Sequence, residues 1–307
     1  MQRAITLYTP MIYTRKDLES AGMSPRRITS TVRAGLLIRL RRNRYARPDL
    51  DDTVAEAARI GGRVTCLSLL QLLGVFVLTS SALHLQVSQN GSRLGPATRG
   101  APRLHWAKER EHEHLHVTSL SVAIRHSVRC QSPRAAVATL DSLLHHGLIT
   151  LPKLQSLFLE LPERFQTLLG LVDPSAESGP ETFVRLLLRA IGVSFETQVL
   201  IDGVGRVDFV VDGWLIIECD SKEFHEGWVK QKQDRSRDLA AARLGYVTIR
   251  PLASDILHRS DTVQRALREV IEVLGPKLGP SRRSQLRKRA PRGGETGARP
   301  GGVGASS

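Results

Sequence analysis

The chain has 307 residues, 41% of them hydrophobic and 24% charged, a balance typical of a globular protein with two or more domains. No apolar run approaches the roughly 18 residues of a membrane span, and no secretory leader is recognisable, so we expect a cytoplasmic protein that makes no use of a membrane. The net charge of +14 is concentrated at the ends: residues 1–50 carry +8, residues 276–307 carry +7, and the part between them carries −1. Basic ends indicate a polyanionic partner, although solubility alone is an open alternative for the low-complexity tail.

The first 50 residues predict two short helices followed by a β-hairpin. Thr14 and Asp17 have the spacing of a helix N-cap with an acid in the first turn, and Ser24 precedes a proline at a first helical position. This order is that of a winged helix-turn-helix. The expected elements are helices at 15–21 and 25–34 and strands at 36–40 and 45–46.

Arginines are concentrated on the second of these helices and in the hairpin, which are the two elements that would meet a DNA duplex. A solvated basic face is the alternative, because many helix-turn-helix folds bind protein instead. The candidate DNA-binding residues are Arg26, Arg27, Arg33, Arg41, Arg42 and Arg44.

The stretch TRKDLESAGMSPRRITSTVRAGLLIRLRRNRYA resembles the N-terminal domain of the AbiEi-type antitoxins of bacterial abortive-infection systems. The resemblance implies a DNA-binding module and makes a toxin protein a candidate partner. Asn43 stands where the wing turn usually has glycine, and asparagine tolerates the left-handed backbone that such a turn requires.

Residues 51–175 predict a mixed α/β linking region. His112, His114 and His116 alternate, which would put three imidazoles on one face of a strand; we favour a half-exposed strand over a metal site. The expected helices lie at 53–60, 66–73, 118–129, 134–146, 151–159 and 162–170, and the expected strands near 83–88, 103–107 and 114–117.

The three cysteines are Cys66, Cys130 and Cys219. They are far apart in sequence and form no CxxC pair, which argues against both a disulfide framework and a zinc ribbon. We therefore expect buried or inert thiols.

Residues 176–275 predict a second domain centred on a hairpin. Two strand-like runs, 206–211 and 214–219, flank the pair Asp212-Gly213, which is typical of a tight turn. The full order of elements is a helix after residue 178, a strand at 195–201, the hairpin, a helix at 228–243, a strand at 246–250 and a helix from about 253. This order predicts a mixed sheet flanked by helices on both faces.

Three acids stand where these strands would normally stay apolar. Asp208 interrupts the first run, and Glu218 and Asp220 end the second. Carboxylates crowded on strand ends repel one another and lose hydration unless a cation compensates them, and Mg²⁺ prefers one or two carboxylates with waters and phosphate oxygens. Lys222 shares the parity of Glu218 and Asp220, so it could stabilise a phosphate or help to deprotonate water.

Four segments, PETFVRLLL, GRVDFVV, IIECDSKEFH and QDRSRDLAAARLGYVTIR, together resemble the branch of the PD-(D/E)XK nuclease superfamily related to very-short-patch repair endonucleases. The resemblance implies a restriction-endonuclease-like fold and a Mg²⁺-dependent phosphodiesterase, with Mn²⁺ as a substitute ion. It further implies Asp208 and Glu218 as metal ligands, Glu181 as a helix-borne acid and Asp220 beside them. The superfamily's lysine normally lies two residues after the glutamate, where this chain has Asp220, so the general base stays open.

Other residues near the hairpin have both a functional and a structural interpretation. Glu181 has capping-box spacing to Ser178, and His225 could orient water or serve only as a surface hydrogen-bonding group. On the helix at 228–243, Arg235 and Arg237 are candidate phosphate contacts.

These patterns predict an α/β protein, α+β overall, in four regions. They are a winged helix-turn-helix at 1–50, a linking region at 51–175, a restriction-endonuclease-like domain at 176–275 and a disordered basic tail at 276–307. The expected function is Mg²⁺-dependent cleavage of DNA, most simply a duplex, with RNA left open as a substrate. The alternative is a DNA-binding regulator of the antitoxin kind with an inactive nuclease-like domain.

Overall fold

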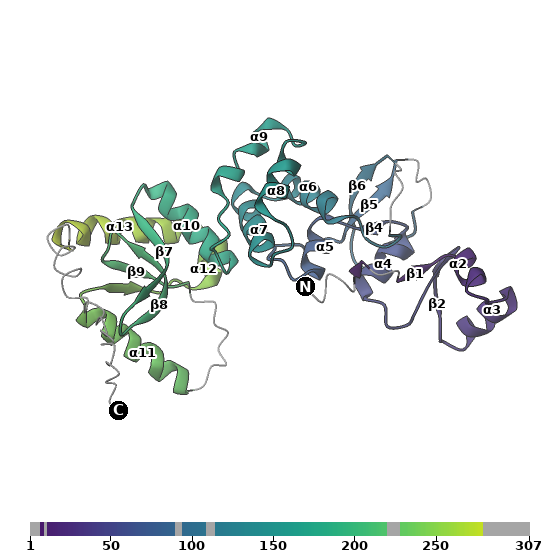
Figure 1. The fold of residues 1–307 in the computed structure, drawn as a ribbon, viewed down its shortest axis with the longest axis horizontal. Helices are drawn as coiled ribbons and strands as arrows, with labels where there is room; N and C mark the ends of the chain where they lie inside the picture. Colours follow the sequence, from purple (N-terminus) through teal and green to yellow (C-terminus); the bar gives the residue numbers. More distant parts are fainter. Residues whose placement is uncertain (1–6, 9–10, 90–93, 109–113, 220–227, 279–307) are drawn as a thin grey trace, which may run out of the picture. The chain divides into compact units, whose positions relative to one another are not determined.

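The computed structural model describes residues 7–8, 11–89, 94–108, 114–219 and 228–278. The chain divides into two compact units: the first comprises 1–190 and 253–260, and the second comprises 191–252 and 261–307. Both contain helices and strands, and the described residues form three small sheets (Figure 1), so the expected mixture of α and β structure is confirmed. No helix in the described ranges is both long and apolar enough to cross a bilayer.

The first unit begins with two short helices and a three-stranded antiparallel sheet of order β1-β3-β2. Thr14 and Asp17 form a capping box at the start of the first helix, with the Thr14 N–H donating to Asp17 Oδ2 at 2.7 Å. Asn43 adopts the expected left-handed conformation, with φ of 60°, and its Oδ1 accepts the Arg15 N–H at 2.7 Å. The bounds are β1 Ile12–Tyr13, α2 Arg15–Ser20, α3 Pro25–Arg33, β2 Ile38–Arg41 and β3 Arg44–Ala46.

The remainder of the first unit is a helical body with a second three-stranded sheet, in which β5 pairs antiparallel to β4 and parallel to β6. The expected strand at 114–117 is wrong: only a single bridge joins Val117 to Val64. The Val64 N–H donates to the carbonyl of His116, and the Thr118 N–H donates to the carbonyl of Val64. These two hydrogen bonds form the bridge, and the pairing does not extend into a strand. The bounds are α4 Asp52–Ile60, β4 Arg63–Val64, α5 Cys66–Leu72, β5 His84–Ser88, β6 Arg103–Ala107, α6 Leu120–Cys130, α7 Pro133–His145, α8 Leu151–Phe158, α9 Glu163–Gln166, a 3-10 turn Leu169–Leu171, α10 Gly179–Ile191 and α12 Ala253–His258.

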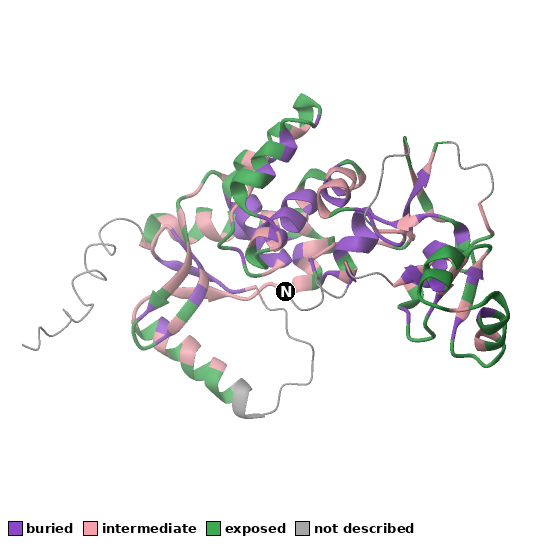
Figure 2. Ribbon diagram, turned by 45° about the vertical axis from the view of Figure 1, so that its right-hand side comes forward, coloured by how far each residue is buried: buried purple, intermediate pink, exposed green. Residues whose placement is uncertain are grey.

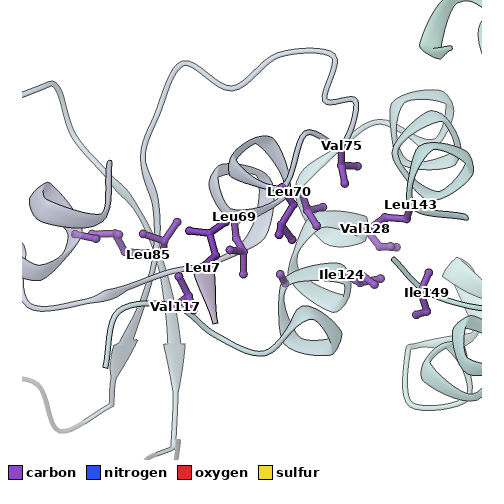
Figure 3. Close-up of a cluster of buried hydrophobic side chains, with 14 of the residues drawn as sticks. Leu7, Leu69, Leu70, Val75, Leu85, Val117, Ile124, Val128, Leu143 and Ile149 are labelled. Atoms are coloured by element: carbon purple, nitrogen blue, oxygen red, sulfur yellow. The ribbon is translucent and has the colours of Figure 1, made fainter. Parts of the chain in front are cut away.

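One hydrophobic core runs through the first unit (Figure 3). Leu69 and Leu70 of α5 contribute to it together with Ile124 of α6, and Leu40 of the N-terminal hairpin belongs to the same cluster. Residues 1–50 therefore share a core with the linking region. The buried positions of this unit, purple in Figure 2, are most frequent on α4, α5, α7 and α10.

The second unit is built on a four-stranded mixed sheet of order β10-β9-β8-β7, in which β10 runs parallel to β9 and the other pairs are antiparallel. Asp212 and Gly213 form the expected tight turn, with φ of 51° and 74°. Ala240 and Ala241 pack one helix, α11, against the sheet. The bounds are β7 Phe195–Ile201, β8 Gly205–Val211, β9 Leu215–Ile217, α11 Trp228–Arg243, β10 Val247–Ile249 and α13 Ser260–Leu278.

Candidate functional site

Asp208 and Glu218 lie opposite one another where the hairpin of the second unit ends. The β8–β9 register pairs Phe209 with Ile217, and one further step of the same register pairs Asp208 with Glu218. The backbone N–H of Cys219 donates to Asp208 Oδ2 at 2.7 Å, which fixes that carboxylate. The Asp212-Gly213 turn therefore sets a register that brings together Asp208 and Glu218, the two predicted metal ligands.

Two arginines bind the carboxylate of Glu218. Arg250, the residue directly after β10, pairs with Oε2, and Arg237 of α11 donates to Oε1 at 2.8 Å. Arg250 also donates to Asp238 Oδ1 at 2.8 Å. The parallel β9–β10 register explains the position of Arg250, because the step after the pair Ile217–Ile249 sets it beside Glu218.

Arg237 also anchors α11 to the hairpin backbone. Its Nε donates to the carbonyl of Val204 at 2.9 Å, and its Nη2 donates to the carbonyl of Arg206 at 2.7 Å. The guanidinium that sequence reasoning assigned to a phosphate thus has three partners inside the second unit. Arg235, the other predicted phosphate contact on α11, has an exposed side chain.

The electrostatics of this site couple the two acids. Burial raises the pKa of Glu218 above its ordinary value, Arg250 and Arg237 oppose that rise, and the charge of Asp208 adds to it. Asp238 and Asp234 also act on Arg250, so four carboxylates lie near two guanidiniums and negative charge is in excess. Such a site attracts a cation more than an anion.

Glu181 lies in the first unit, in the first turn of α10, and is buried. Its Oε1 accepts the Ser178 hydroxyl at 2.7 Å, its Oε2 accepts the Glu177 N–H at 3.0 Å, and its own N–H donates to Ser178 Oγ at 3.3 Å. These contacts are the capping box that its spacing to Ser178 allowed. Three further predicted residues, Asp220, Lys222 and His225, lie outside the described residues.

The predicted DNA-binding arginines of α3 are all exposed: Arg26, Arg27 and Arg33. Arg26 and Arg33 are seven residues apart, so they share one face of the helix, while Ile28 is buried on another. The helix thus separates a cationic face from the small core beneath it.

The arginines of the N-terminal hairpin border a cavity of about 770 Å³ in the first unit. Arg41, Arg42 and Arg44 line it together with Arg63 of β4. Partial burial lowers the pKa of Arg44, and the nearby charge of Arg41 lowers it further. Crowded cations around a cavity favour an anionic ligand such as a phosphate.

The Arg41 side chain is also held by the protein itself, since its Nη1 donates to the carbonyl of Ile60 at 3.3 Å. Gly61 leaves room for it: a Cβ at that position, where φ is 103°, would lie 1.6 Å from Arg41 Nη1. Arg42, at the turn, has an exposed side chain. The hairpin therefore offers both a fixed and an exposed arginine.

Sequence reasoning missed a cluster of two cysteines and two histidines in the first unit. Cys66, His84, His105 and Cys130 place their ligand atoms within 4.8 Å of one another. All three cysteines are free thiols, but only Cys66 is buried, and Cys66 and Cys130 lie close together. Burial raises the pKa of Cys66, whereas a hydrogen bond with Cys66 lowers the pKa of Cys130. Sulfur and nitrogen ligands are not the oxygen ligands that Mg²⁺ prefers.

The histidines at 114 and 116 do not join this cluster. His116 is buried and its Nε2 hydrogen-bonds the carbonyl of Leu7 at 2.8 Å, while the ring of His114 lies 5.4 Å from that of Tyr8. Both therefore attach the described N-terminal segment to the body of the unit. His112 lies outside the described residues.

No protein-family model matches the chain, and no curated protein matches its sequence.

Proposed function

We propose that the protein hydrolyses phosphodiester bonds of double-stranded DNA with the help of a divalent cation, Mg²⁺ or Mn²⁺. The observation that carries this proposal is that Asp208 and Glu218 lie one register step beyond the pair Phe209–Ile217, close enough for the charge of Asp208 to raise the pKa of Glu218. Two carboxylates on adjacent strands, one of them buried, are an electrostatically unfavourable pair that a divalent cation relieves. The second unit is then a restriction-endonuclease-like domain, and residues 1–50 a winged helix-turn-helix that holds the duplex.

The donor set suits Mg²⁺, which takes one or two protein carboxylates and completes its shell with water and phosphate oxygens. Each carboxylate oxygen has two lone pairs, so Asp208 and Glu218 keep acceptor capacity beside the hydrogen bonds they already accept. A divalent cation would offset the excess of negative charge at the site, which favours the approach of a phosphodiester. When bound, the ion supplies polarisation of the phosphoryl oxygen and a more acidic water.

The chain's own residues prepare the site. Arg250 and Arg237 favour the ionised form of Glu218 against the effect of burial, and they fix its orientation from two sides. The Cys219 N–H holds Asp208 in the same way. Lys222 remains the predicted candidate for stabilising the phosphate or helping to deprotonate the attacking water, and Asp220 remains a predicted third metal ligand.

A second candidate function is a DNA-binding regulator of the antitoxin kind, with a toxin partner and an inactive nuclease-like domain. One observation favours it: both oxygens of Glu218 are already bound by arginines, so the chain itself compensates that carboxylate. Under this alternative the pair Glu218–Arg250 is structural, and the cationic face of α3 carries the activity.

Cleavage of supercoiled plasmid by the purified full-length protein separates the two functions. With Mg²⁺ or Mn²⁺, the wild type should convert the plasmid to nicked or linear forms, and Asp208→Asn and Glu218→Gln should abolish that activity. Asp202→Asn is the matched control, because Asp202 is an exposed acid in the turn between β7 and β8. Salt-dependent duplex binding without cleavage under either ion would reject the nuclease and leave the regulator.

Duplex binding by α3 is tested through its salt dependence. Each phosphate contact contributes about 0.9 to the slope of log K against log salt, so the double substitution Arg26→Ala and Arg27→Ala should reduce the slope by about 2 if both residues touch phosphates. The charge-matched control replaces Arg265 and Arg268, which are exposed on α13. Equal slopes for the two double variants would show that Arg26 and Arg27 of α3 do not contact the phosphates of the duplex.

A further inference from the structure

We propose a tetrahedral zinc site in the first unit. Its four ligands are Cys66, His84, His105 and Cys130. They come from four separate elements: the first residue of α5, the first residue of β5, the middle of β6 and the last residue of α6. The site is independent of the acid pair in the second unit.

Two of the ligand separations lie within about 0.4 Å of those of a Cys₂His₂ zinc site. Zn–N bonds of about 2.05 Å and Zn–S bonds of about 2.3 Å, set at the tetrahedral angle, give N···N of about 3.3 Å and N···S of about 3.5 Å. The observed distance from His84 Nδ1 to His105 Nε2 is 3.3 Å, and that from Cys130 Sγ to His105 Nε2 is 3.9 Å. Small movements of the side chains would bring all four ligand atoms within bonding distance of one ion.

The chemistry of the ligands selects the metal. Two thiolates with two imidazoles suit Zn²⁺, a borderline-soft ion that is four-coordinate in structural sites, whereas Mg²⁺ requires oxygen ligands. Four protein ligands fill the tetrahedral shell and leave no open position for a substrate. The site is therefore structural.

The fold holds the ligands as a built site. Cys66 is fully buried and has a left-handed backbone, with φ of 53°, a strained conformation for a residue other than glycine. His84 is buried, and its backbone N–H donates to Ser68 Oγ at 2.9 Å. His105 and Cys130 are partly exposed, which gives an ion an entry path.

Contacts around the ligands also restrict their orientation. The ring of His126 stacks on that of His105, with centroids 4.2 Å apart and an interplanar angle of 18°. His126 Nδ1 lies 3.1 Å from the Thr65 hydroxyl, which is next to Cys66 in the chain. Such outer contacts orient metal ligands. A zinc ion here would connect α5 and α6 to the neighbouring strands β5 and β6.

The test is the zinc content of the full-length protein after incubation with Zn²⁺ and removal of unbound ion. We expect about one zinc per chain in the wild type and in Cys219→Ser, and loss of that zinc in Cys130→Ser. The two variants are matched, since both replace a partly exposed cysteine. Titration of the wild type with Co²⁺ should give the intense visible absorption of tetrahedral cobalt bound by thiolates.

Three results would overturn the site. One is a wild-type chain that retains less than about a tenth of an equivalent of zinc. Another is a Cys130→Ser chain that retains zinc as well as the wild type does. The third is a Cys66–Cys130 disulfide in freshly purified wild type, identified by thiol labelling, combined with failure to take up Co²⁺ after reduction.

Discussion

Replacing Arg250 by methionine should destabilise the second unit by about 2 kcal/mol at neutral pH. The side chains of Arg250 and Glu218 are only 23% and 11% exposed, so this ion pair is not one of the solvent-screened surface pairs that contribute little. Loss of one partner of a buried pair costs about 3–5 kcal/mol, and the remaining bond from Arg237 to Glu218 reduces that figure.

The effect should depend on pH in a defined direction. Burial already raises the folded-state pKa of Glu218, and removing the Arg250 charge raises it further. An acid whose pKa rises on folding binds more protons in the folded state, so its stabilising contribution is present below the unfolded pKa and lost as pH rises through the folded pKa. The decrease in the free energy of unfolding caused by Arg250→Met should therefore be smaller near about pH 4 than near about pH 7.

Tryptophan fluorescence can follow the second unit by itself. The chain has three tryptophans, and Trp214 is buried in the hairpin of that unit. With Trp106 and Trp228 replaced by phenylalanine, urea denaturation reports through Trp214. The control is Arg243→Met, since Arg243 is an exposed arginine near the end of α11.

A double-mutant cycle completes the test. Combining Glu218→Gln with Arg250→Met should recover part of the lost stability, because the unpaired buried charge is gone. Strictly additive free-energy changes, or an Arg250→Met variant as stable as the wild type at both pH values, would refute the electrostatic description of this site.

Two further predictions concern the first unit. Asp141→Ala should lower the free energy of unfolding of this unit by about 3–5 kcal/mol. Arg185 is 1% exposed and pairs with Asp141 at 2.6 Å, so the substitution would leave its charge buried without that partner. A decrease of less than about 1 kcal/mol, measured by calorimetry, would contradict this prediction. Thr14→Ala should cost about 1 kcal/mol through loss of the α2 capping box, as measured by urea denaturation. Hydrogen bonds from the Thr14 backbone and side chain lower the pKa of Asp17. The stabilisation that Asp17 contributes is therefore present above about pH 4 and is lost as pH falls through its folded-state pKa. A Thr14→Ala variant whose stability depends on pH as the wild type's does would contradict the cap.

The local elements could be predicted where the sequence carries a chemical reason for them. The helix at 228–243 and the strand at 103–107 have the predicted bounds, and the Asp212-Gly213 turn has the expected positive φ values. Asn43 adopts the left-handed conformation inferred from its position in the hairpin. Because the turn fixes the hairpin register, the meeting of two acids also follows from local sequence.

Contacts that depend on distant pairing could not be predicted. The partnership of Arg250 with Glu218 requires the parallel pairing of β10 with β9 across a helical crossover, which no local pattern specifies. The two-residue strand β1 was not predicted because it forms by pairing with β3, which is distant in the sequence.

The Cys/His cluster was missed for the same reason. Its members are separated by 18, 21 and 25 residues and lie on four elements, so no short ligand motif marks them. The one signal in the sequence was the placement of histidines on two expected strands between two cysteine-bearing helices. Without the parallel register of β5 and β6, that pattern does not indicate proximity.

The most direct test of the central claim is the single-turnover rate at which the full-length protein cleaves a labelled DNA duplex in the presence of Mg²⁺, compared with Asp208→Asn. If the paired acids hold the cation for hydrolysis, the substitution should lower the rate at least about a hundredfold, while Asp202→Asn leaves it unchanged. Cleavage by Asp208→Asn within about twofold of the wild-type rate would contradict the account.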